Sequence, residues 1–297
     1  MLLRTTTFAA FVAASAVTGC TGDDSAPRPQ RTAESAGRVD IGGYELAWQC
    51  RGEGSPTVIL DAGLDTAGTS EWLDFLPQLD AIGTRVCTYD RAGTGTSDPR
   101  LDGEAPTAAT QAEELHSLLH GAGIEPPLVL VPHSYAGLIA RMYADHYPDE
   151  VAGLVLEDVS TAWDIDLWPK WDDGPWIDGG RRTDIQATER EVLDAAPLGD
   201  TPTVVVSQAT YDEEGIPAWA APIFARHQAK LAALGDDVIQ VRVDGSGHWI
   251  HRDEPTAMIA AIVAVVGAVR AGEELPGCNE VFDKEQVTCR GGFHALP

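Results

Sequence analysis

The chain has 297 residues, 44% of them hydrophobic, which is enough to bury the core of one large α/β domain. Its formal net charge of −26 argues against a nucleic-acid partner, whose phosphates need Lys and Arg, and against a basic surface that docks onto anionic lipid. We interpret the charge as that of a highly solvated acidic surface.

The first residues have the pattern of an export signal. A weakly positive start, MLLR, precedes the apolar run TTTFAAFVAASAV, which has the length of a signal peptide and is too short to span a membrane. The run leads into VTGC, which resembles a bacterial lipobox, so residues 1–19 are expected to be removed and Cys20 to be diacylated. The alternative is an ordinary secretory signal with an incidental cysteine. Residues 20–36 are polar and contain proline, which predicts a flexible tether, and the folded domain is expected over 37–297.

The other four cysteines would reach an oxidising compartment if the chain is exported, and four cysteines allow three disulfide pairings. Cys278 and Cys289 lie in a polar tail, residues 271–297, that shows no core of its own. We therefore expect a disulfide between them to stabilise the tail. Cys50 and Cys87 would then pair with each other. The cysteine spacing contains no C-x-x-C, and no metal is expected.

Strands and helices alternate along the body of the chain, after a hairpin around Gly42–Gly43. Short apolar runs predict buried strands over 57–62, 84–90, 127–131, 151–158, 201–207 and 237–243. Helical patterns cover 70–82, 107–123, 135–147, 218–234 and 254–270. Fully apolar strands that alternate with helices predict a mostly parallel sheet covered on both faces. The apolar run of the last helix is too short to cross a bilayer and ends in Arg270, so we expect a packed helix.

The segment 159–200, after the sixth strand, has the position of a cap over an active site. It holds half of the eight tryptophans, namely Trp163, Trp168, Trp171 and Trp176. These side chains either shape an apolar acyl or alcohol pocket, or serve to pack down a short cap that has few strands.

Three residues suited to hydrolysis follow predicted strands. In a parallel sheet, chemistry collects at the carboxyl ends of the strands. Ser134 lies at the turn from a strand into a helix, Asp158 ends a strand, and His248 follows one through a glycine-containing loop. A serine hydroxyl becomes a good nucleophile when an imidazole removes its proton and a carboxylate orients the imidazole. The chain order Ser, Asp, His is that of α/β-hydrolases.

The sequence resembles the α/β-hydrolase superfamily from about Arg38 to about Arg270. Four segments carry the resemblance, in the order CRGEGSPTVILDAGLDTAG, RVCTYDRAGTGTSD, LVPHSYAGLIARMYADHYPDEVAGLVLED and SGHWIHRDEP. The resemblance implies an α/β-hydrolase fold with a short cap insert, a nucleophile at Ser134 and a base at His248. It also implies an oxyanion hole that is formed by the backbone N–H groups of Leu64 and Tyr135. The glycine-rich DRAGTGTSD segment is expected to be a structural turn, since it lacks the third glycine of a dinucleotide loop.

The turn at Ser134 departs from the G-x-S-x-G pattern, because Pro132 and Ala136 stand where glycines are usual. Ala136 adds only a methyl group, and Gly137 follows at once. Pro132 favours an extended Val131 but lacks an N–H, which is expected to cost one sheet hydrogen bond. Read alone, the segment fits a structural serine as well as a nucleophile, and the other two residues favour the nucleophile.

The triad acid has two candidates. Across the superfamily the acid more often follows the seventh strand, where Asp212 is the candidate. However, Asp212 stands among Glu213 and Glu214, which fits a solvated acidic loop equally well. Asp158 lies directly at a strand end and is favoured, while its neighbour Glu157 is expected to point to the opposite face of the sheet.

The remaining histidines show no partner motif. His133 is expected to pack in the turn at Ser134, and His251 to be a helix-entry or surface residue. The others fall within predicted helices, namely His116, His120, His146 and His227.

These observations predict a serine hydrolase that cleaves apolar carboxylic esters through an acyl-enzyme, without cofactor or metal. We expect it to be exported and anchored to the cell surface only through lipid at Cys20, or otherwise secreted. Other chemistry on the same residues stays open, including acyl transfer, amide cleavage, cofactor-free peroxidation and a lyase reaction. A non-catalytic surface lipoprotein that uses the fold as a binding module is the alternative from another class, and fold alone cannot choose among these.

Overall fold

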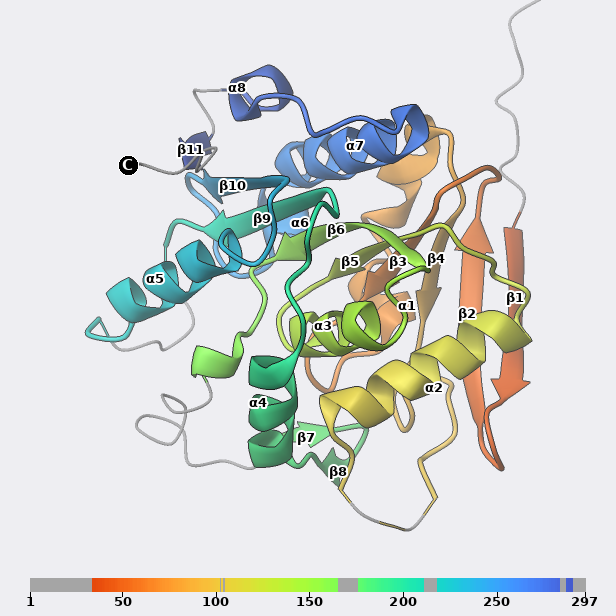
Figure 1. Cartoon of the computed structure of the whole chain (residues 1–297). Coiled ribbons are helices and arrows are strands. Elements are labelled where there is room, and N and C mark those ends of the chain that lie inside the picture. Colours follow the sequence, from red (N-terminus) through yellow and green to blue (C-terminus); the bar gives the residue numbers. More distant parts are fainter. Residues whose placement is uncertain are drawn as a thin grey trace, which may run out of the picture. The chain divides into compact units, whose positions relative to one another are not determined.

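A nine-stranded sheet forms the centre of the structure, with helices on both of its faces (Figure 1). The computed structural model describes residues 34–101, 103, 105–164, 176–210, 218–283 and 287–290. The expected signal peptide, Cys20, Asp212, Trp168 and Trp171 lie outside these residues. The first strand begins at Glu34, so the end of the predicted tether belongs to the fold instead.

The sheet is parallel in its middle and antiparallel at its edges. In spatial order its strands are β1 (Glu34–Asp40), β2 (Glu45–Arg51), β4 (Val86–Tyr89), β3 (Thr57–Asp61), β5 (Leu128–Pro132), β6 (Val151–Glu157), β9 (Thr203–Gln208), β10 (Val238–Val243) and β11 (Val287–Arg290). The strands from β4 to β10 in this order run parallel, while β1, β2 and β11 are antiparallel to their neighbours. The carboxyl ends of β3, β5, β6, β9 and β10 therefore share one edge, where sites form in such folds.

The helices divide between the two faces of the sheet. Within the described residues they are α1 (Gly68–Glu71), α2 (Ala108–Gly121), α3 (Ala136–His146), α4 (Ile185–Asp194), α5 (Ala221–Leu231), α6 (Ile250–Asp253), α7 (Pro255–Ala271), α8 (Cys278–Val281) and the 3-10 helices η1 (Leu76–Ile82) and η2 (Ala162–Asp164). Figure 1 shows α2 and α3 on the face opposite to α7. None of the helices in the described ranges has the length and apolar character that a membrane span needs.

Alternation along the buried strands supplies both cores. Ile59 packs in the core that includes α2 and α3, whereas Val58 and Leu60 on the same strand pack with α7. Because successive side chains of a strand point to opposite faces, an uninterrupted apolar run is what a doubly covered strand requires. The predicted parallel sheet with helices on both faces is confirmed.

The predicted helix over 70–82 is wrong as a continuous element. The structure has the short helix α1, then an irregular stretch, then the 3-10 helix η1. Pro77 stands at the start of η1, and a proline inside an α-helix removes one hydrogen bond and clashes with the preceding turn. Gly83, with a φ of 66°, ends the segment.

The tail after residue 271 has more structure than the sequence predicts. β11 pairs with β10 in antiparallel register, from Val243↔Val287 to Gln240↔Arg290, and so forms the ninth strand. Phe282 and Val287 are 5% exposed and belong to the core on the α7 side. The tail therefore contributes residues to the core of the domain, which the sequence did not predict.

Two disulfides join the pairs of cysteines that the sequence suggests. Cys278 and Cys289 link α8 to β11. Cys50 and Cys87 lie directly opposite each other on the antiparallel strands β2 and β4, with a Cα–Cα distance of 4.0 Å.

The insert between β6 and β9 holds η2, the small hairpin of β7 (Ile177–Asp178) and β8 (Arg181–Arg182), and α4. Of its tryptophans, Trp176 lies beside Tyr135, with ring centroids 5.8 Å apart, and Trp163 lines an apolar pocket. Trp176 is thus an example of the expected packing role, and Trp163 is an example of the expected pocket-forming role.

Candidate active site

Ser134 lies in a tight, strained turn between β5 and α3. Its φ is 54°, in the left-handed region that residues other than glycine seldom adopt. The turn is held by a hydrogen bond from the Ser134 N–H to the Glu157 carbonyl, of 3.1 Å, and by one from the Ser160 N–H to the Ser134 carbonyl, of 2.8 Å. Strain that surrounding bonds maintain is typical of functional sites.

The departures from G-x-S-x-G have visible consequences. The β5–β6 ladder runs to Leu130↔Leu154 and returns only as an isolated bridge at His133↔Glu157, so it is interrupted beside Pro132, which has no N–H to donate. The close approach falls at Gly137, where a Cβ would lie 2.3 Å from the Cβ of Val159. Gly137 is therefore the glycine that allows α3 to pack closely against the chain after β6. It stands one residue after the second glycine position of G-x-S-x-G.

Asp158 and His248 meet at the carboxyl edge of the sheet. The Oδ2 atom of Asp158 lies 2.7 Å from Nδ1 of His248, and its Oδ1 atom accepts from the Gln208 N–H at 3.1 Å. Asp158 is buried, whereas the His248 side chain is 21% exposed. The bond to Asp158 uses Nδ1, so proton exchange with a serine would take place at Nε2.

The backbone N–H groups of Leu64 and Tyr135 take part in none of the hydrogen bonds found among the described residues. Arg91 holds the loop that carries Leu64 in place. Its guanidinium donates hydrogen bonds to the carbonyls of Ala62, at 2.6 Å, and Gly63. A loop held through its carbonyls can keep its next N–H pointing at a substrate.

Arg91 is itself buried between two carboxylates, Asp61 and Asp178, each 2.8 Å away. Burial alone would lower the pKa of Arg91, but Asp178 and Asp61 outweigh it and hold the pKa well above its usual value. Burial raises the pKa of Asp61 to about 6 against the opposing effect of Arg91. Asp178 belongs to the cap hairpin and also accepts from the Asp65 N–H at 2.9 Å, so it links the cap to this loop. The predicted structural role of the DRAGTGTSD segment is consistent with these bonds.

His133 and Glu71 form a second buried acid–histidine pair beside the site, and Glu71 was not among the predicted site residues. The His133 Nδ1 atom lies 2.8 Å from Glu71, and its Nε2 atom donates to the backbone carbonyl of His248 at 3.0 Å. Glu71 also accepts from the Gly63 N–H at 3.1 Å. Burial would raise the pKa of Glu71, but the hydrogen bond and charge of His133, together with the other donors, lower it. His133 packs in the turn at Ser134, and Glu71 connects it to the Leu64 loop.

Glu157 and His251 form a third pair. The Glu157 Oε1 atom accepts from the His251 backbone N–H at 2.7 Å and lies 2.8 Å from its Nδ1 atom. His251 is the second residue of the helix α6 and is 2% exposed, so the helix-entry alternative is confirmed and the surface alternative is wrong. Glu157 has a partner other than His248, in keeping with the expected alternation along β6.

Other histidines also have acidic neighbours that the sequence did not indicate. His227 Nδ1 lies 2.6 Å from Asp164, in contact with η2. His116 and His120 both approach Glu150.

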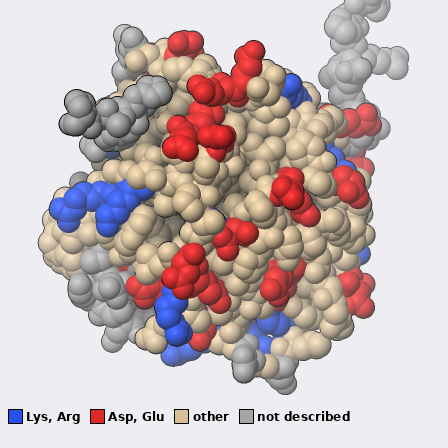
Figure 2. Space-filling model, viewed as in Figure 1, with Lys and Arg blue, Asp and Glu red and all other residues tan. Residues whose placement is uncertain are grey.

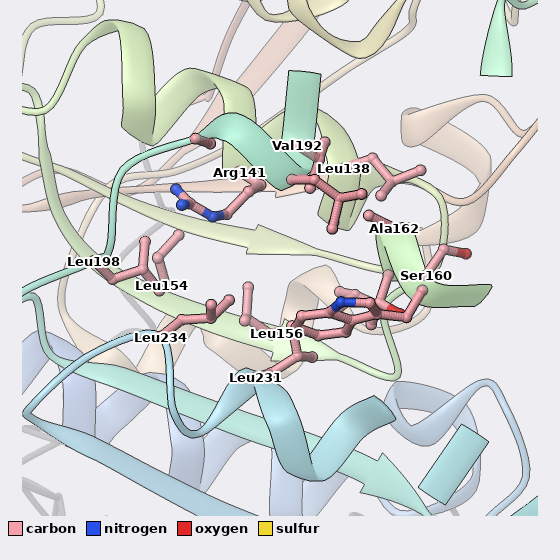
Figure 3. Close-up of a pocket in the computed structure, with 16 residues that line it drawn as sticks. Leu138, Arg141, Leu154, Leu156, Ser160, Ala162, Val192, Leu198, Leu231 and Leu234 are labelled. Carbon is pink, nitrogen blue, oxygen red and sulfur yellow. The ribbon is translucent and has the colours of Figure 1, made fainter. Parts of the chain in front are cut away.

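An apolar pocket of about 90 Å³ lies behind the Ser134 turn, between α3, β6, η2, α4 and α5. Figure 3 shows leucine side chains from several of these elements around it, with Arg141 as the charged residue among them. Gly137 and Ser160 line the pocket, and both of their N–H groups bond to the Ser134 carbonyl, at 3.0 and 2.8 Å. The pocket therefore borders the backbone of the Ser134 turn, although Ser134 and His248 are not among the residues that line it.

The visible face of the molecule is rich in acidic residues, as the net charge of −26 predicts (Figure 2). Figure 2 shows Asp and Glu spread over this face of the molecule, with Lys and Arg in fewer places.

A family model described as alpha/beta hydrolase fold matches residues 56–215, more than half of the chain. The chain therefore belongs to the α/β-hydrolase family. It is 26% identical over 224 residues to the uncharacterized protein YqjL of Bacillus subtilis (strain 168), an alignment that covers 72% of this chain and 85% of that protein.

Solved structures of the same fold carry different activities in their names. Epoxide hydrolase A from Mycobacterium thermoresistibile matches with a TM-score of 0.60 and 19% identity, covering 82% of this chain and 100% of that chain. A thermophilic esterase from Thermogutta terrifontis matches with a TM-score of 0.57 and 18% identity, covering 79% of this chain and 99% of that chain. The fold is shared with both, and family membership makes the protein a hydrolase.

Proposed function

We propose that the protein is a serine hydrolase that cleaves carboxylic esters. The observation that carries the proposal is the 2.7 Å contact between Asp158 and His248, at the strand edge that also presents the strained Ser134. A carboxylate, an imidazole and a hydroxyl at one edge of a parallel sheet form the set that acyl transfer to serine requires.

In the proposed reaction the Ser134 hydroxyl attacks the ester carbonyl while His248 takes its proton at Nε2. Asp158 holds the Nδ1–H of the resulting imidazolium, and the N–H groups of Leu64 and Tyr135 stabilise the oxyanion. His248 then returns the proton to the leaving alcohol, which departs and leaves an acyl group on Ser134. A water molecule that gives its proton to His248 then attacks the acyl-enzyme. The carboxylic acid is released and Ser134 recovers its proton.

The substrate class that we propose is an ester with an apolar acyl chain. The leucine-lined pocket next to Gly137 and Ser160 supports it, because an acyl group on Ser134 needs an apolar space within reach. Esters are favoured over epoxides because Ser134, His248 and Asp158 supply a nucleophile with its base and orienting acid.

Replacing the nucleophile tests the proposal directly. Ser134→Ala should abolish ester hydrolysis and fluorophosphonate labelling while leaving the thermal unfolding temperature almost unchanged, because the hydroxyl contributes little to the core. Ser160→Ala is the matched control, since that serine lines the pocket but has no proposed chemical role, and it should keep both signals. Unchanged turnover in the Ser134→Ala protein would exclude the serine-hydrolase mechanism, and a wild type that reacts with neither probe would favour a binding module.

We also propose that the protein is exported and attached to the membrane through lipid at Cys20. The support is the apolar run that leads into VTGC, and two acyl chains are enough for stable attachment. The protein made in bacteria should partition into the detergent phase, and the Cys20→Ala variant should stay in the aqueous phase. An intact mass that shows cleavage elsewhere and an unmodified Cys20 would contradict this proposal.

A further inference from the structure

Three side chains gather at the end of the sheet opposite to the catalytic edge. His116 and His120 lie one turn apart near the end of α2, and Glu150 lies in the turn that leads into β6. The Nε2 atoms of the two histidines approach the same carboxylate oxygen, Oε1 of Glu150, at 3.2 and 2.9 Å.

These separations fit the coordination shell of a zinc ion. One donor atom from each of the three side chains can be chosen so that all lie within 4.8 Å of one another. Zinc bonds to imidazole nitrogen and carboxylate oxygen are about 2.0–2.2 Å long, so neighbouring ligand atoms of a tetrahedral site are roughly 3.3 Å apart. The two distances to Glu150 are close to that edge length, so small side-chain shifts would admit an ion.

The side chains around this cluster orient the ligand atoms. The His116 ring stacks on Tyr147, with centroids 3.8 Å apart and an interplanar angle of 6°. The second oxygen of Glu150, Oε2, accepts from the Tyr143 hydroxyl at 2.5 Å. Hydrogen bonds and stacking of this kind fix ligands around protein metal sites.

The cluster is open to solvent yet not fully exposed. The side-chain exposures are 28% for His116, 45% for His120 and 17% for Glu150. An ion can therefore enter from solution, and a water molecule can complete the coordination.

We propose that His116, His120 and Glu150 bind one divalent metal ion of the zinc class, with water as the remaining ligand. Two imidazoles and one carboxylate suit zinc, nickel or copper, whereas magnesium and calcium prefer oxygen ligands throughout. The site would be structural, because it joins α2 to the turn between α3 and β6. Glu150 precedes β6 while Asp158 follows it, so the seven residues of that strand separate the two sites by roughly 25 Å.

The test is a titration of the EDTA-treated, full-length protein with Zn²⁺. Calorimetry should find one tight site per chain, and saturation should raise the thermal unfolding temperature by about 5 °C, while Mg²⁺ should give no shift. His120→Gln and Glu150→Gln should each remove the site and the shift. His146→Gln is the matched control, because His146 lies on a nearby helix, is exposed and is no member of the cluster. It should behave as the wild type.

Absence of a Zn²⁺-dependent shift in the wild-type protein would overturn the proposal. The same stoichiometry and shift in the His120→Gln variant would overturn it as well, since the ion would then bind elsewhere. An equal response to Mg²⁺ would point to acidic surface groups instead of imidazoles. Ester hydrolysis should be unchanged by His120→Gln, so this result is independent of the proposed reaction.

Discussion

Two neighbouring residues, Glu157 and Asp158, each pair with a histidine, yet the two pairs occupy different surroundings. The contact from Asp158 to His248 is 2.7 Å, and that from Glu157 to His251 is 2.8 Å. The side chain of His248 is 21% exposed, whereas that of His251 is 1% exposed. Hydrogen-bond geometry alone therefore does not distinguish the pair with a proposed catalytic role from the buried one. Exposure to solvent does.

The different surroundings follow from the backbone. Glu157 is the last residue of β6, and Asp158 turns away from the strand direction with a φ of 39°. One carboxylate is thereby directed toward α6, where the His251 ring lies tilted against Trp72, with ring centroids 4.3 Å apart and an interplanar angle of 41°. The other reaches the loop that carries His248.

The largest effect is expected from Asp158→Asn. Loss of the orienting acid should lower kcat for ester hydrolysis by about 10³ to 10⁴ while the protein stays folded, because the imidazolium loses its partner. Asp212→Asn is the control and should lower kcat only mildly. Steady-state kinetics with circular dichroism would check this, and the reverse ranking would move the acid to Asp212.

A smaller effect, on stability instead of turnover, is expected from Glu157→Ala. It should lower the free energy of unfolding by about 3 kcal/mol, since it leaves the buried His251 side chain and N–H without their acceptor. Glu157→Gln keeps an acceptor oxygen and should cost about 1 kcal/mol. Urea unfolding measures both. A folded Glu157→Ala protein that loses turnover as severely as Asp158→Asn would show that this pair is catalytic after all.

Removing both partners of the buried pair should cost less than removing one. The Oε2 atom of Glu157 and the Nε2 atom of His251 have no hydrogen-bond partner within the described residues. Replacing the pair by Met at 157 and Leu at 251 removes these atoms together, so the double variant should lose less stability than Glu157→Ala, by about 1–2 kcal/mol. Urea midpoints of the two proteins would decide it, and additive losses would argue against a coupled pair.

The smallest effect concerns the pair of Glu71 and His133, and it depends on pH. The pKa of Glu71 is lowered below its usual value of 4.5, so its contribution to stability is present above that pH and is lost as the pH falls through the folded-state pKa. Glu71→Gln should therefore flatten the loss of stability on acidification below about pH 4.5. Urea midpoints between pH 3 and 6 would measure the slope, and parallel profiles for both proteins would contradict the assignment.

The sequence was informative where the signal is local. The apolar runs predicted the parallel strands, and Ser134, Asp158 and His248 were chosen as candidates because each follows such a run, His248 after a short loop. The break before Pro77 was missed, because the helical pattern around it outweighed the proline, which disrupts an α-helix.

Contacts between distant residues could not be read in this way. Glu71 meets His133 across 62 residues, and Arg91 meets Asp178 across 87. Each is an ordinary charged or polar residue in its own segment, and only the packing of the sheet and cap selects its partner. The strand β11 was missed for a related reason, since a four-residue segment with one buried valine has no period to detect.

The strand β11 also covers an edge of the sheet. Without it, β10 would present unpaired N–H and C=O groups along that edge, and exposed edge strands can pair with other chains and lead to aggregation. β11 covers them, and the bond between Cys278 and Cys289 ties it to α8. We therefore expect the disulfide to help keep β11 paired with β10, and its reduction to make this edge more available to other chains.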